Sequence, residues 1–388
     1  MRDPARPLVW LHASSVGEGL QARPVAQALR AGHPDWQLAY TFFSPSAEQF
    51  AQSLDTDITD YLPFDRAGDA DAMLDALSPS ILVFAKLDVW PTLVERAAAR
   101  GIPVALISGT LSAASGRRGW WSRQLVGDAY AALSAVGAID AEHAERLAQL
   151  GVARSALSVT GDTRFDQVWA KTDEVHRASP LLARLSSVRP TIVAGSTWPA
   201  DEDVLLPAWP SRLDPGIPPG SPPPRLIIAP HEPTAAHCAP IQAWAQRASL
   251  RLARLSELEQ SSTINDLDVI LVDRVGVLGE LYALATVAFV GGGFHSKGLH
   301  SVIEPAAFGV PVVFGPQWSM SREAGLLLNA DGAHCVSSLL ALGNQMREWL
   351  FYPASRERAG AAARAVVVRE LGATARTVRM IEQAMTPR

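Results

Sequence analysis

Residues 289–316 read FVGGGFHSKGLHSVIEPAAFGVPVVFGP, and this stretch decides the fold. An apolar run over residues 286–290 predicts a buried strand, glycines 291–293 break it, and a helix is expected to begin near Ser301. Glycines at such a turn let a ligand approach the main chain, and the helix N-terminus favours an anion. Glu304, one turn inside the helix, could accept hydrogen bonds from ribose hydroxyls. The stretch therefore favours a nucleotide site over an ordinary strand-to-helix turn.

Short apolar runs alternate with longer helical stretches along the whole chain, which is the pattern of parallel sheets with crossover helices. In the first half, strands are expected at residues 7–12, 37–41, 58–62, 81–85, 104–108, 135–138 and 157–160. In the second half, they are expected from residue 191 and at 225–229, 269–272, 286–290, 310–314 and 334–336. The 388 residues, 48% of them hydrophobic, suffice for two cores. We expect an α/β protein with Rossmann-like domains at 1–172 and 173–365, and a C-terminal helix at 366–388 that packs back on the first domain.

Composition excludes several classes of protein. The net charge of -5 and the isoelectric point near 6.0 provide no basic excess, so we expect no nucleic-acid partner. Cys238 and Cys335 lie far apart and predict neither a disulfide framework nor a zinc site, which fits a reducing, cytoplasmic location. No apolar run reaches the ~18 residues of a membrane span, and the charged start of the chain is unlike a signal peptide.

Patterns for other chemistries are also missing. Acidic pairs such as Asp55 and Asp57 have no histidine or cysteine cluster beside them, so no metal site is predicted. Ser14 and Ser15 lie outside any G-x-S-x-G motif, and no dinucleotide-binding glycines follow the first strand. Two Rossmann-like halves, with a nucleotide site in the second and a lone acid in the first, favour glycosyl transfer from a nucleotide sugar.

Candidate residues of the first half follow the ends of strands, where ligands of open α/β sheets bind. Glu18, Ser14 and Ser15 come directly after the first strand. Ser15 and Glu18 also have the spacing of a capping box, and from the residues alone helix capping is the favoured role of Glu18. Lys86 and Asp88 follow the strand at 81–85, where a charged side chain is either functional or simply solvated.

Candidate residues of the second half occupy equivalent positions. Ser196 and Thr197 follow the strand that begins at residue 191, where small donors suit a phosphate or carboxylate as well as a routine helix N-cap. His231 and Glu232 follow the strand at 225–229. A lone histidine is more often structural than a ligand, but the place of His231 beyond a strand end makes it a candidate.

Seven motifs, in order and spread over nearly the whole chain, carry a resemblance to a known family. They are HASSVGE (12–18), DVWP (88–91), VTGDTRFD (159–166), AGSTWPADE (194–202), APHEP (229–233), GVLGEL (276–281) and FVGGGF…GLHSVIEPA…FGVPVVFGP (289–316). With these motifs the chain resembles the 3-deoxy-D-manno-octulosonic acid (Kdo) transferases of lipopolysaccharide assembly.

The resemblance implies a metal-independent, inverting glycosyltransferase of the GT-B fold, in which two Rossmann-like domains face each other across a cleft. It implies transfer of Kdo from CMP-Kdo to a lipid A precursor (lipid IVA), with no cofactor. Glu18 matches the general base, which outweighs the capping interpretation, and Arg164 replaces a lysine whose charge stabilises the transition state. Lys86 is the third expected catalytic residue. The implied CMP-binding residues are His231, Glu232, Leu278, Gly279, Glu280, Ser301, Val302, Ile303 and Glu304.

The sequence departs from the family pattern at several places. Lys86 stands where many members have a glutamate, Ser301 replaces the usual asparagine, and the PHEP motif lacks the usual arginine. The family's N-terminal hydrophobic anchor has no counterpart in this sequence. Two explanations stay open: the enzyme attaches peripherally to the cytoplasmic face of the bacterial inner membrane, through Trp120, Trp121 and the arginines beside them, or the start codon has been placed late.

Two alternatives stay open at this point. One is a GT-B transferase that uses a uridine-linked sugar, which the relative affinity for CMP and uridine diphosphate would separate. The other is a catalytically silent relative that binds the nucleotide or the lipid, for which replacement of Glu18 would remove no turnover.

Overall fold

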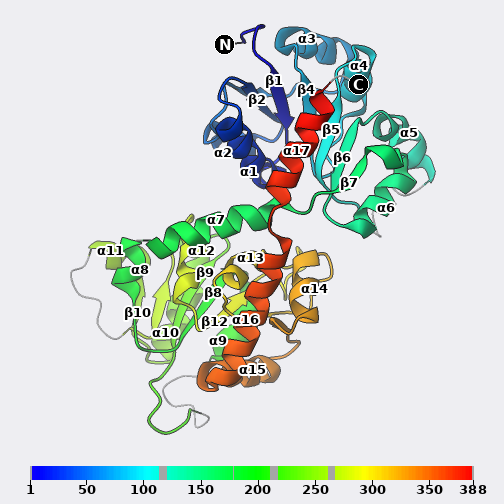
Figure 1. Ribbon diagram of the computed structural model, residues 1–388. Helices are drawn as coiled ribbons and strands as arrows, with labels where there is room; N and C mark the ends of the chain where they lie inside the picture. Colours follow the sequence, from blue (N-terminus) through cyan, green and yellow to red (C-terminus); the bar gives the residue numbers. More distant parts are fainter. Residues whose placement is uncertain (1, 113–119, 178, 210–216, 261–266, 387–388) are drawn as a thin grey trace. The chain divides into compact units, whose positions relative to one another are not determined.

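The computed structural model describes the chain except residues 1, 113–119, 178, 210–216, 261–266 and 387–388 (Figure 1). Two compact units divide it: the first comprises Met1–Gln167 and Glu370–Arg388, and the second comprises Val168–Arg369. The sequence places the boundaries instead at 172/173 and 365/366. The first boundary lies inside helix α7 (Thr163–Arg177), so no loop marks it, whereas the second lies at the end of helix α16 (Pro353–Glu370), beside the turn at residues 371–372.

The first unit is built on a parallel seven-stranded sheet in the order β3-β2-β1-β4-β5-β6-β7. Its strands are β1 (Leu8–His12), β2 (Gln37–Phe42), β3 (Ile58–Tyr61), β4 (Ile81–Ala85), β5 (Val104–Gly109), β6 (Ala135–Ala138) and β7 (Leu157–Val159). Its helices are α1 (Val16–Gly32), η1 (Pro45–Ala47), α2 (Glu48–Gln52), α3 (Ala67–Leu77), α4 (Pro91–Ala99), α5 (Trp120–Ala131), α6 (Ala141–Leu150), η3 (Arg154–Ala156), the start of α7, and α17 (Ala373–Met385). All seven strands predicted from the sequence are confirmed, with ends shifted by a residue or so.

Apolar residues cover both faces of this sheet, which is why its strands read as continuous hydrophobic runs. In β4, Ile81 and Val83 pack toward α1 and α17, while Leu82 and Phe84 pack toward α3 and α4. The C-terminal helix α17 lies beside α1 and completes this layer with the buried side chain of Ile381 (Figure 1).

The second unit repeats the architecture, with the order β10-β11-β9-β8-β12-β13-β14 in a second parallel sheet. Its strands are β8 (Thr191–Thr197), β9 (Arg225–Pro230), β10 (Leu252–Arg254), β11 (Val269–Leu271), β12 (Val287–Val290), β13 (Val312–Phe314) and β14 (Ala333–Cys335). Its helices are α8 (Pro180–Leu185), α9 (Pro199–Ala208), α10 (Ala235–Arg247), α11 (Leu255–Gln260), α12 (Leu278–Leu281), η4 (Tyr282–Leu284), α13 (Ile303–Ala307), α14 (Arg322–Asn329), α15 (Leu339–Phe351) and α16. The expected α/β class, with two Rossmann-like units, is confirmed.

Two local expectations differ from the structure. The edge strand β10 was not predicted, because its three residues, Leu-Ala-Arg, carry no alternating apolar pattern. The helix expected near Ser301 begins at Ile303 and is only five residues long. The glycine stretch is thus followed by a longer irregular loop than its sequence suggests.

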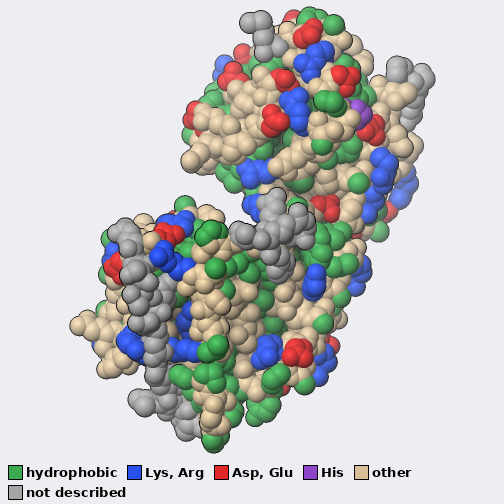
Figure 2. All heavy atoms as spheres, turned by 60° about the vertical axis from the view of Figure 1, so that its left-hand side comes forward, with side chains coloured by type: hydrophobic (Ala, Val, Ile, Leu, Met, Phe, Trp, Pro, Cys, Tyr) green, Lys and Arg blue, Asp and Glu red, His purple; other side chains and the backbone are tan. Residues whose placement is uncertain are grey.

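The distribution of charged side chains on the surface agrees with the small net charge of the sequence. On the face of the first unit that Figure 2 shows, acidic and basic side chains are intermingled rather than separated by sign. No helix in the described ranges has both the length and the apolar character needed to cross a bilayer. The side chains of Trp120, Trp121 and the arginines beside them lie outside the described residues.

Candidate active site

The strand order creates one topological switch point in each sheet. In the first unit β1 pairs with both β2 and β4, and in the second unit β8 pairs with both β9 and β12. The connection after β1 leads to one side of the first sheet and the connection after β4 leads to the other, and the same is true of β8 and β12 in the second sheet. The loops at the carboxyl ends of these strands therefore diverge and leave room for a ligand. Ser14, Ser15 and Glu18 follow β1, and Ser196 and Thr197 follow β8; most of the other predicted site residues follow the neighbouring strands β4, β9 and β12.

Glu18 lies in the first turn of α1, directly after β1, and its side chain is 21% exposed. The hydroxyl of Ser15 donates to Glu18 Oε2, and Lys86 Nζ lies 3.8 Å from Glu18 Oε1. Ser15 is the N-cap residue of α1, but its side chain caps no backbone N–H. The capping box favoured by residue spacing is therefore not formed; the Ser15 hydroxyl contacts the carboxylate itself.

Lys86 belongs to the tight turn that follows β4. Its backbone has a φ of 66°, the left-handed region that few non-glycine residues adopt. Backbone strain of this kind costs of order 1–3 kcal/mol and persists where the surroundings hold the turn. Here Lys86 N donates to the carbonyl oxygen of Ile107 at 2.8 Å, which keeps the lysine at the mouth of the switch point.

Asp88 ties the loops after β1 and β4 together. One of its carboxylate oxygens accepts from the amide of Ser14 at 2.9 Å and lies 3.3 Å from His12 Nε2, while the other accepts from the indole of Trp90 at 3.2 Å. Burial alone would raise the pKa of the Asp88 carboxyl, but the hydrogen bonds from His12 and Ser14 hold it below its usual value. His12 is fully buried, and its Nδ1 lies 2.9 Å from the hydroxyl of Thr41. A charged, hydrogen-bonded carboxylate thus fixes the loop that leads to Glu18.

Arg164 lies at the start of α7. Its guanidinium binds the carboxylate of Asp162, with Nη2 2.7 Å from Oδ2, and Asp162 is only 1% exposed. The neighbouring hydroxyl of Thr163 donates to the carbonyl oxygen of Gln21 in α1 at 2.7 Å. Arg164 is therefore held by an aspartate of its own motif, and its motif is joined to the helix that carries Glu18.

The last residue of the same motif has a structural role. Asp166 accepts from the amides of Gly372 and Thr374 at 2.7 and 2.6 Å. It thereby caps the N-terminus of α17, which carries unpaired N–H groups.

At the second switch point, the glycine loop is held by packing of main chain against main chain. A Cβ on Gly291 would lie 2.2 Å from the carbonyl oxygen of Ser196, and one on Gly293 would lie 2.4 Å from the amide of Gly315. No side chain fits at these distances. The glycines were interpreted from the sequence as a means of ligand approach, but the structure gives them a direct reason in the close contact of three loops.

A buried aspartate joins this loop to α9. Asp201 is fully buried, and its carboxylate accepts from the amides of Gly292, Phe294 and Trp198 at 2.7, 3.0 and 2.9 Å. Three such bonds satisfy donors that would otherwise be buried without a partner. The loop shape is therefore set by a residue that sequence reasoning did not single out.

Ser196 and Thr197 occupy the end of β8, as expected, but differ in exposure. Ser196 is partly exposed and has a φ of 54°, whereas Thr197 is fully buried and donates to Glu202 at 2.7 Å. Glu202 also contacts His237 Nε2 at 2.9 Å. Burial raises the pKa of Glu202 against these two hydrogen bonds. Thr197 is thus part of a buried network, and Ser196 is the more accessible of the two.

Aromatic rings gather around His231 in a stack that we call the imidazole cluster: Trp198, His231, His295 and His300, with Lys297 above the indole. The Trp198 ring lies 4.5 Å from that of His295 and 4.6 Å from that of His231, and His231 stacks on His300 at 4.4 Å. Lys297 Nζ lies 4.7 Å from the centre of the Trp198 ring. Sequence reasoning found only His231; the signal it missed was that the glycine loop itself carries two histidines and a lysine.

His300 accepts a hydrogen bond within this cluster. The indole N–H of Trp198 donates to His300 Nε2 at 3.1 Å, which requires an unprotonated nitrogen. Burial, and then the nearby His231 and His295, lower the pKa of His300 to about 4. The cluster therefore combines a neutral acceptor, the exposed ring of His231, partly buried rings and a cation, a set that can stack on a base or meet an anion.

The remaining predicted CMP-binding residues lie in two short segments. Ser301 donates to Glu304 Oε2 at 2.5 Å, Val302 and Ile303 are buried, and Glu304 lies in the first turn of α13. Glu232 is exposed beside His231.

In the other segment, Leu278 packs beside Gly195, and an added methyl group on Gly279 would meet no atom within 4 Å. Glu280 accepts from Ser179 at 2.6 Å and lines a hollow of about 370 Å³ with Arg184 and Arg274.

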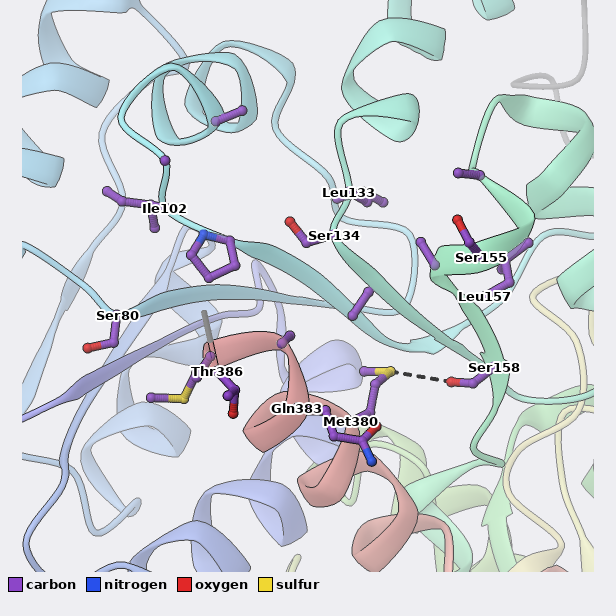
Figure 3. Close-up of a pocket in the computed structure, with 18 of the residues that line it drawn as sticks. Ser80, Ile102, Leu133, Ser134, Ser155, Leu157, Ser158, Met380, Gln383 and Thr386 are labelled. Carbon is purple, nitrogen blue, oxygen red and sulfur yellow. Dashed lines mark hydrogen bonds between the residues drawn. The ribbon is translucent and has the colours of Figure 1, made fainter. Parts of the chain in front are cut away.

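A larger cavity lies in the first unit, at the edge of its sheet opposite to the one that carries Glu18 (Figure 3). It measures about 870 Å³ and is lined by residues that precede strands, such as Ser80, Pro103 and Ser134, and by Met380 and Thr386 at the end of α17. These positions mark the amino ends of β4, β5 and β6. The cavity is therefore separate from the switch point that holds Glu18.

Among the residues that the structure describes, no group of three or more His, Cys, Asp or Glu side chains is arranged to hold a metal ion.

Comparisons with solved structures show the fold. A UDP-GlcNAc 2-epimerase from Neisseria meningitidis superposes with a TM-score of 0.68 at 14% identity, covering 97% of this chain and 100% of that one. MurG from Acinetobacter baumannii superposes with a TM-score of 0.61 at 14% identity, covering 97% and 99%. With two parallel sheets, each with a topological switch point, the protein has the GT-B fold.

Sequence comparisons narrow this class. The profile described as "3-Deoxy-D-manno-octulosonic-acid transferase (kdotransferase)" matches residues 2–167. A 3-deoxy-D-manno-octulosonic acid transferase from Bordetella pertussis is 31% identical over 388 residues, covering 96% of this chain and 86% of that protein. One from Haemophilus influenzae is 26% identical over 381 residues, with the same coverage. The chain belongs to the 3-deoxy-D-manno-octulosonic acid transferase family.

Proposed function

We propose that this protein transfers Kdo from CMP-Kdo to a lipid A precursor, lipid IVA, with inversion and without a metal ion or other cofactor. The observation that carries the proposal is the position of Glu18, a partly exposed carboxylate beside Lys86 at the switch point of the first unit. Family membership supports the donor and the acceptor class.

Glu18 would act as the general base. The acceptor hydroxyl attacks the anomeric carbon of Kdo, its proton passes to Glu18, and the bond between that carbon and the CMP phosphate oxygen breaks. Ser15 orients the carboxylate, and Lys86 and Arg164 supply positive charge on the first unit. These roles follow from position and charge.

The second unit would hold CMP. A phosphate that gains charge as it leaves is stabilised by cations and donors fixed beforehand. Lys297 and the rings of the imidazole cluster supply such groups next to the glycine loop, and Ser301 and Glu304 could bind the ribose. We place the reaction at the cytoplasmic face of the inner membrane, where a peripheral enzyme would meet its lipid acceptor.

The deciding experiment measures CMP release from CMP-Kdo in the presence of lipid IVA in detergent. For Glu18→Gln we expect a loss of about 100-fold or more in turnover, the range for a general base, with CMP affinity unchanged. Glu95→Gln, an exposed position on α4, is the matched control and should retain full turnover. Absence of turnover in the unmodified protein, or tighter binding of uridine diphosphate than of CMP, would overturn the proposal.

A further inference from the structure

The cavity at the amino edge of the first sheet has no role in the proposed reaction, and its lining is uncharged (Figure 3). Its volume of about 870 Å³ lies within the range of small-molecule sites. Although 19% of the chain is charged, none of the described residues that line this cavity is Asp, Glu, Lys, Arg or His. The cavity therefore offers no counter-charge to an ionised ligand.

Charged residues that adjoin the lining in the sequence are engaged in ion pairs of their own. Arg100 binds Asp71 at 2.6 Å, and Arg154 binds Glu145 at 2.9 Å. The carboxylate of Glu382 lies 2.7 Å from the imidazole at the C-cap of α1. An ionised ligand in the cavity would lose water without gaining a partner of opposite charge, which is costly.

Hydrogen-bonding side chains nevertheless line the cavity. Ser80 Oγ accepts from the amide of Leu8 at 3.2 Å, and Ser134 Oγ accepts from the amide of Val104 at 3.3 Å. Within the described part of the chain neither hydroxyl donates its own proton, so both can donate to a ligand. The complete set of polar side chains in the lining is Ser80, Ser134, Ser155, Ser158, Gln383 and Thr386.

These polar groups are interleaved with apolar side chains rather than separated from them. The neighbouring strands run in the order β4-β5-β6-β7. Ser80 precedes β4, Leu133 and Ser134 precede β6, and Leu157 and Ser158 lie in β7 (Figure 3). A lipid, with a polar head and a separate tail, does not match this distribution. A sugar does, because its rings carry hydroxyl groups around the rim and apolar C–H groups on the faces.

From these observations we propose that the cavity binds an uncharged saccharide. CMP-Kdo would not bind there, since its phosphate and carboxylate call for cations. The site is therefore separate from that of the proposed reaction, and the inference does not depend on the proposed function. Because Met380 and Gln383 of α17 line the cavity together with the sheet, the bound sugar should hold the C-terminal helix in place.

The first test measures hydrogen exchange of the full-length protein with and without maltose, an uncharged disaccharide. At a maltose concentration about ten times the dissociation constant, we expect exchange in residues 380–385 to slow by about tenfold.

Two tryptophan variants at the end of α4 provide the matched comparison. Ala98 lines the cavity beside Gly101, where an added methyl group would meet no atom within 4 Å, so Ala98→Trp should fill the space and abolish the effect of maltose. Ala99 is equally exposed but does not line the cavity, so Ala99→Trp should retain the effect.

The second test addresses the polar contacts and the charge of the ligand. Gln383→Ala combined with Ser155→Ala removes two exposed polar side chains of the lining, and the dissociation constant for maltose should rise about tenfold. Thermal stability without maltose should stay unchanged. Glucose and glucuronate differ by one carboxylate; glucose should compete with maltose, and glucuronate should not.

Four results would overturn the inference. Exchange that is unaffected by maltose would mean that no such sugar binds. Slower exchange that persists in Ala98→Trp would mean a general solute effect. Equal competition by glucuronate would mean that neutrality is not selected. Protection by 1-octanoylglycerol but not by maltose would mean that a lipid occupies the cavity. None of these measurements requires turnover, so each can be read whether or not the transferase reaction is observed.

Discussion

The two switch points each contain an aspartate that joins neighbouring loops, but the two carboxylates differ in what surrounds them. Asp201 in the second unit is fully buried and accepts from three backbone amides. Asp88 in the first unit has a side chain that is 23% exposed and binds one backbone amide, a histidine and an indole. The two sheets have the same topology around their switch points, but the two carboxylates have different hydrogen-bond partners.

This difference distinguishes an aspartate that only fixes the shape of a loop from one that lies near the proposed base. A carboxylate saturated by buried amides fixes a loop and offers no oxygen to a ligand. A carboxylate held by side chains, with part of its surface open, can respond to what binds beside it. We therefore assign Asp201 to the architecture of the glycine loop and Asp88 to the positioning of the Glu18 loop.

The largest expected effect is that of Asp201→Asn on stability. An amide cannot accept all three N–H bonds, so we expect the free energy of unfolding of the second unit to fall by about 2–4 kcal/mol. Hydrogen exchange should accelerate at Gly292 and Phe294 and stay unchanged in the first unit. Asp203→Asn, an exposed position on the same helix, should have no effect. Equal exchange in both variants would contradict the assignment.

Asp88→Asn should affect turnover more than stability. Removing the charge weakens the bonds to Ser14 and His12, so we expect kcat with lipid IVA to fall by about tenfold and the free energy of unfolding by about 1–2 kcal/mol. CMP affinity, a property of the second unit, should stay unchanged. The control is Asp55→Asn, whose side chain is 81% exposed. A variant with normal kcat would show that the loop needs no charge at this position.

The smallest expected effect is on the pH dependence of stability, through His300. Because the pKa of His300 is lowered from 6.5 to about 4, the unfolded chain takes up this proton first as the pH falls. The stabilisation is fully present above about pH 6.5 and is lost progressively down to about pH 4. His300→Gln keeps an acceptor for Trp198 but cannot be protonated, so its thermal midpoint should fall less between neutral pH and about pH 5. His334→Gln, at an exposed position, should follow the unmodified protein.

The fold was largely predictable from the sequence, because buried parallel strands are marked by apolar runs and bounded by turn residues. The seven strands of the first sheet were found in this way, and β10 was missed for lack of such a run. The first unit boundary was displaced because α7 passes through it without a break, whereas the second boundary lies at the end of α16.

The candidate site was predictable only in part. Glu18, Lys86 and Asp88 follow strand ends, and this position is visible in the sequence. The roles of Asp166, Asp201 and the imidazole cluster depend on loops brought together from distant parts of the chain, which spacing does not reveal.

The capping of α17 by Asp166 has a consequence for how the protein is made. The first unit lacks one helix of its core until residues 370–388 have been synthesised, because Ile381 and Ala373 are fully buried in it. Chains generally fold from the N-terminus during synthesis, domain by domain. In this protein the order is interrupted: the second unit is complete on the ribosome before the first, and the unit that carries Glu18 reaches its final packing only when α17 has emerged.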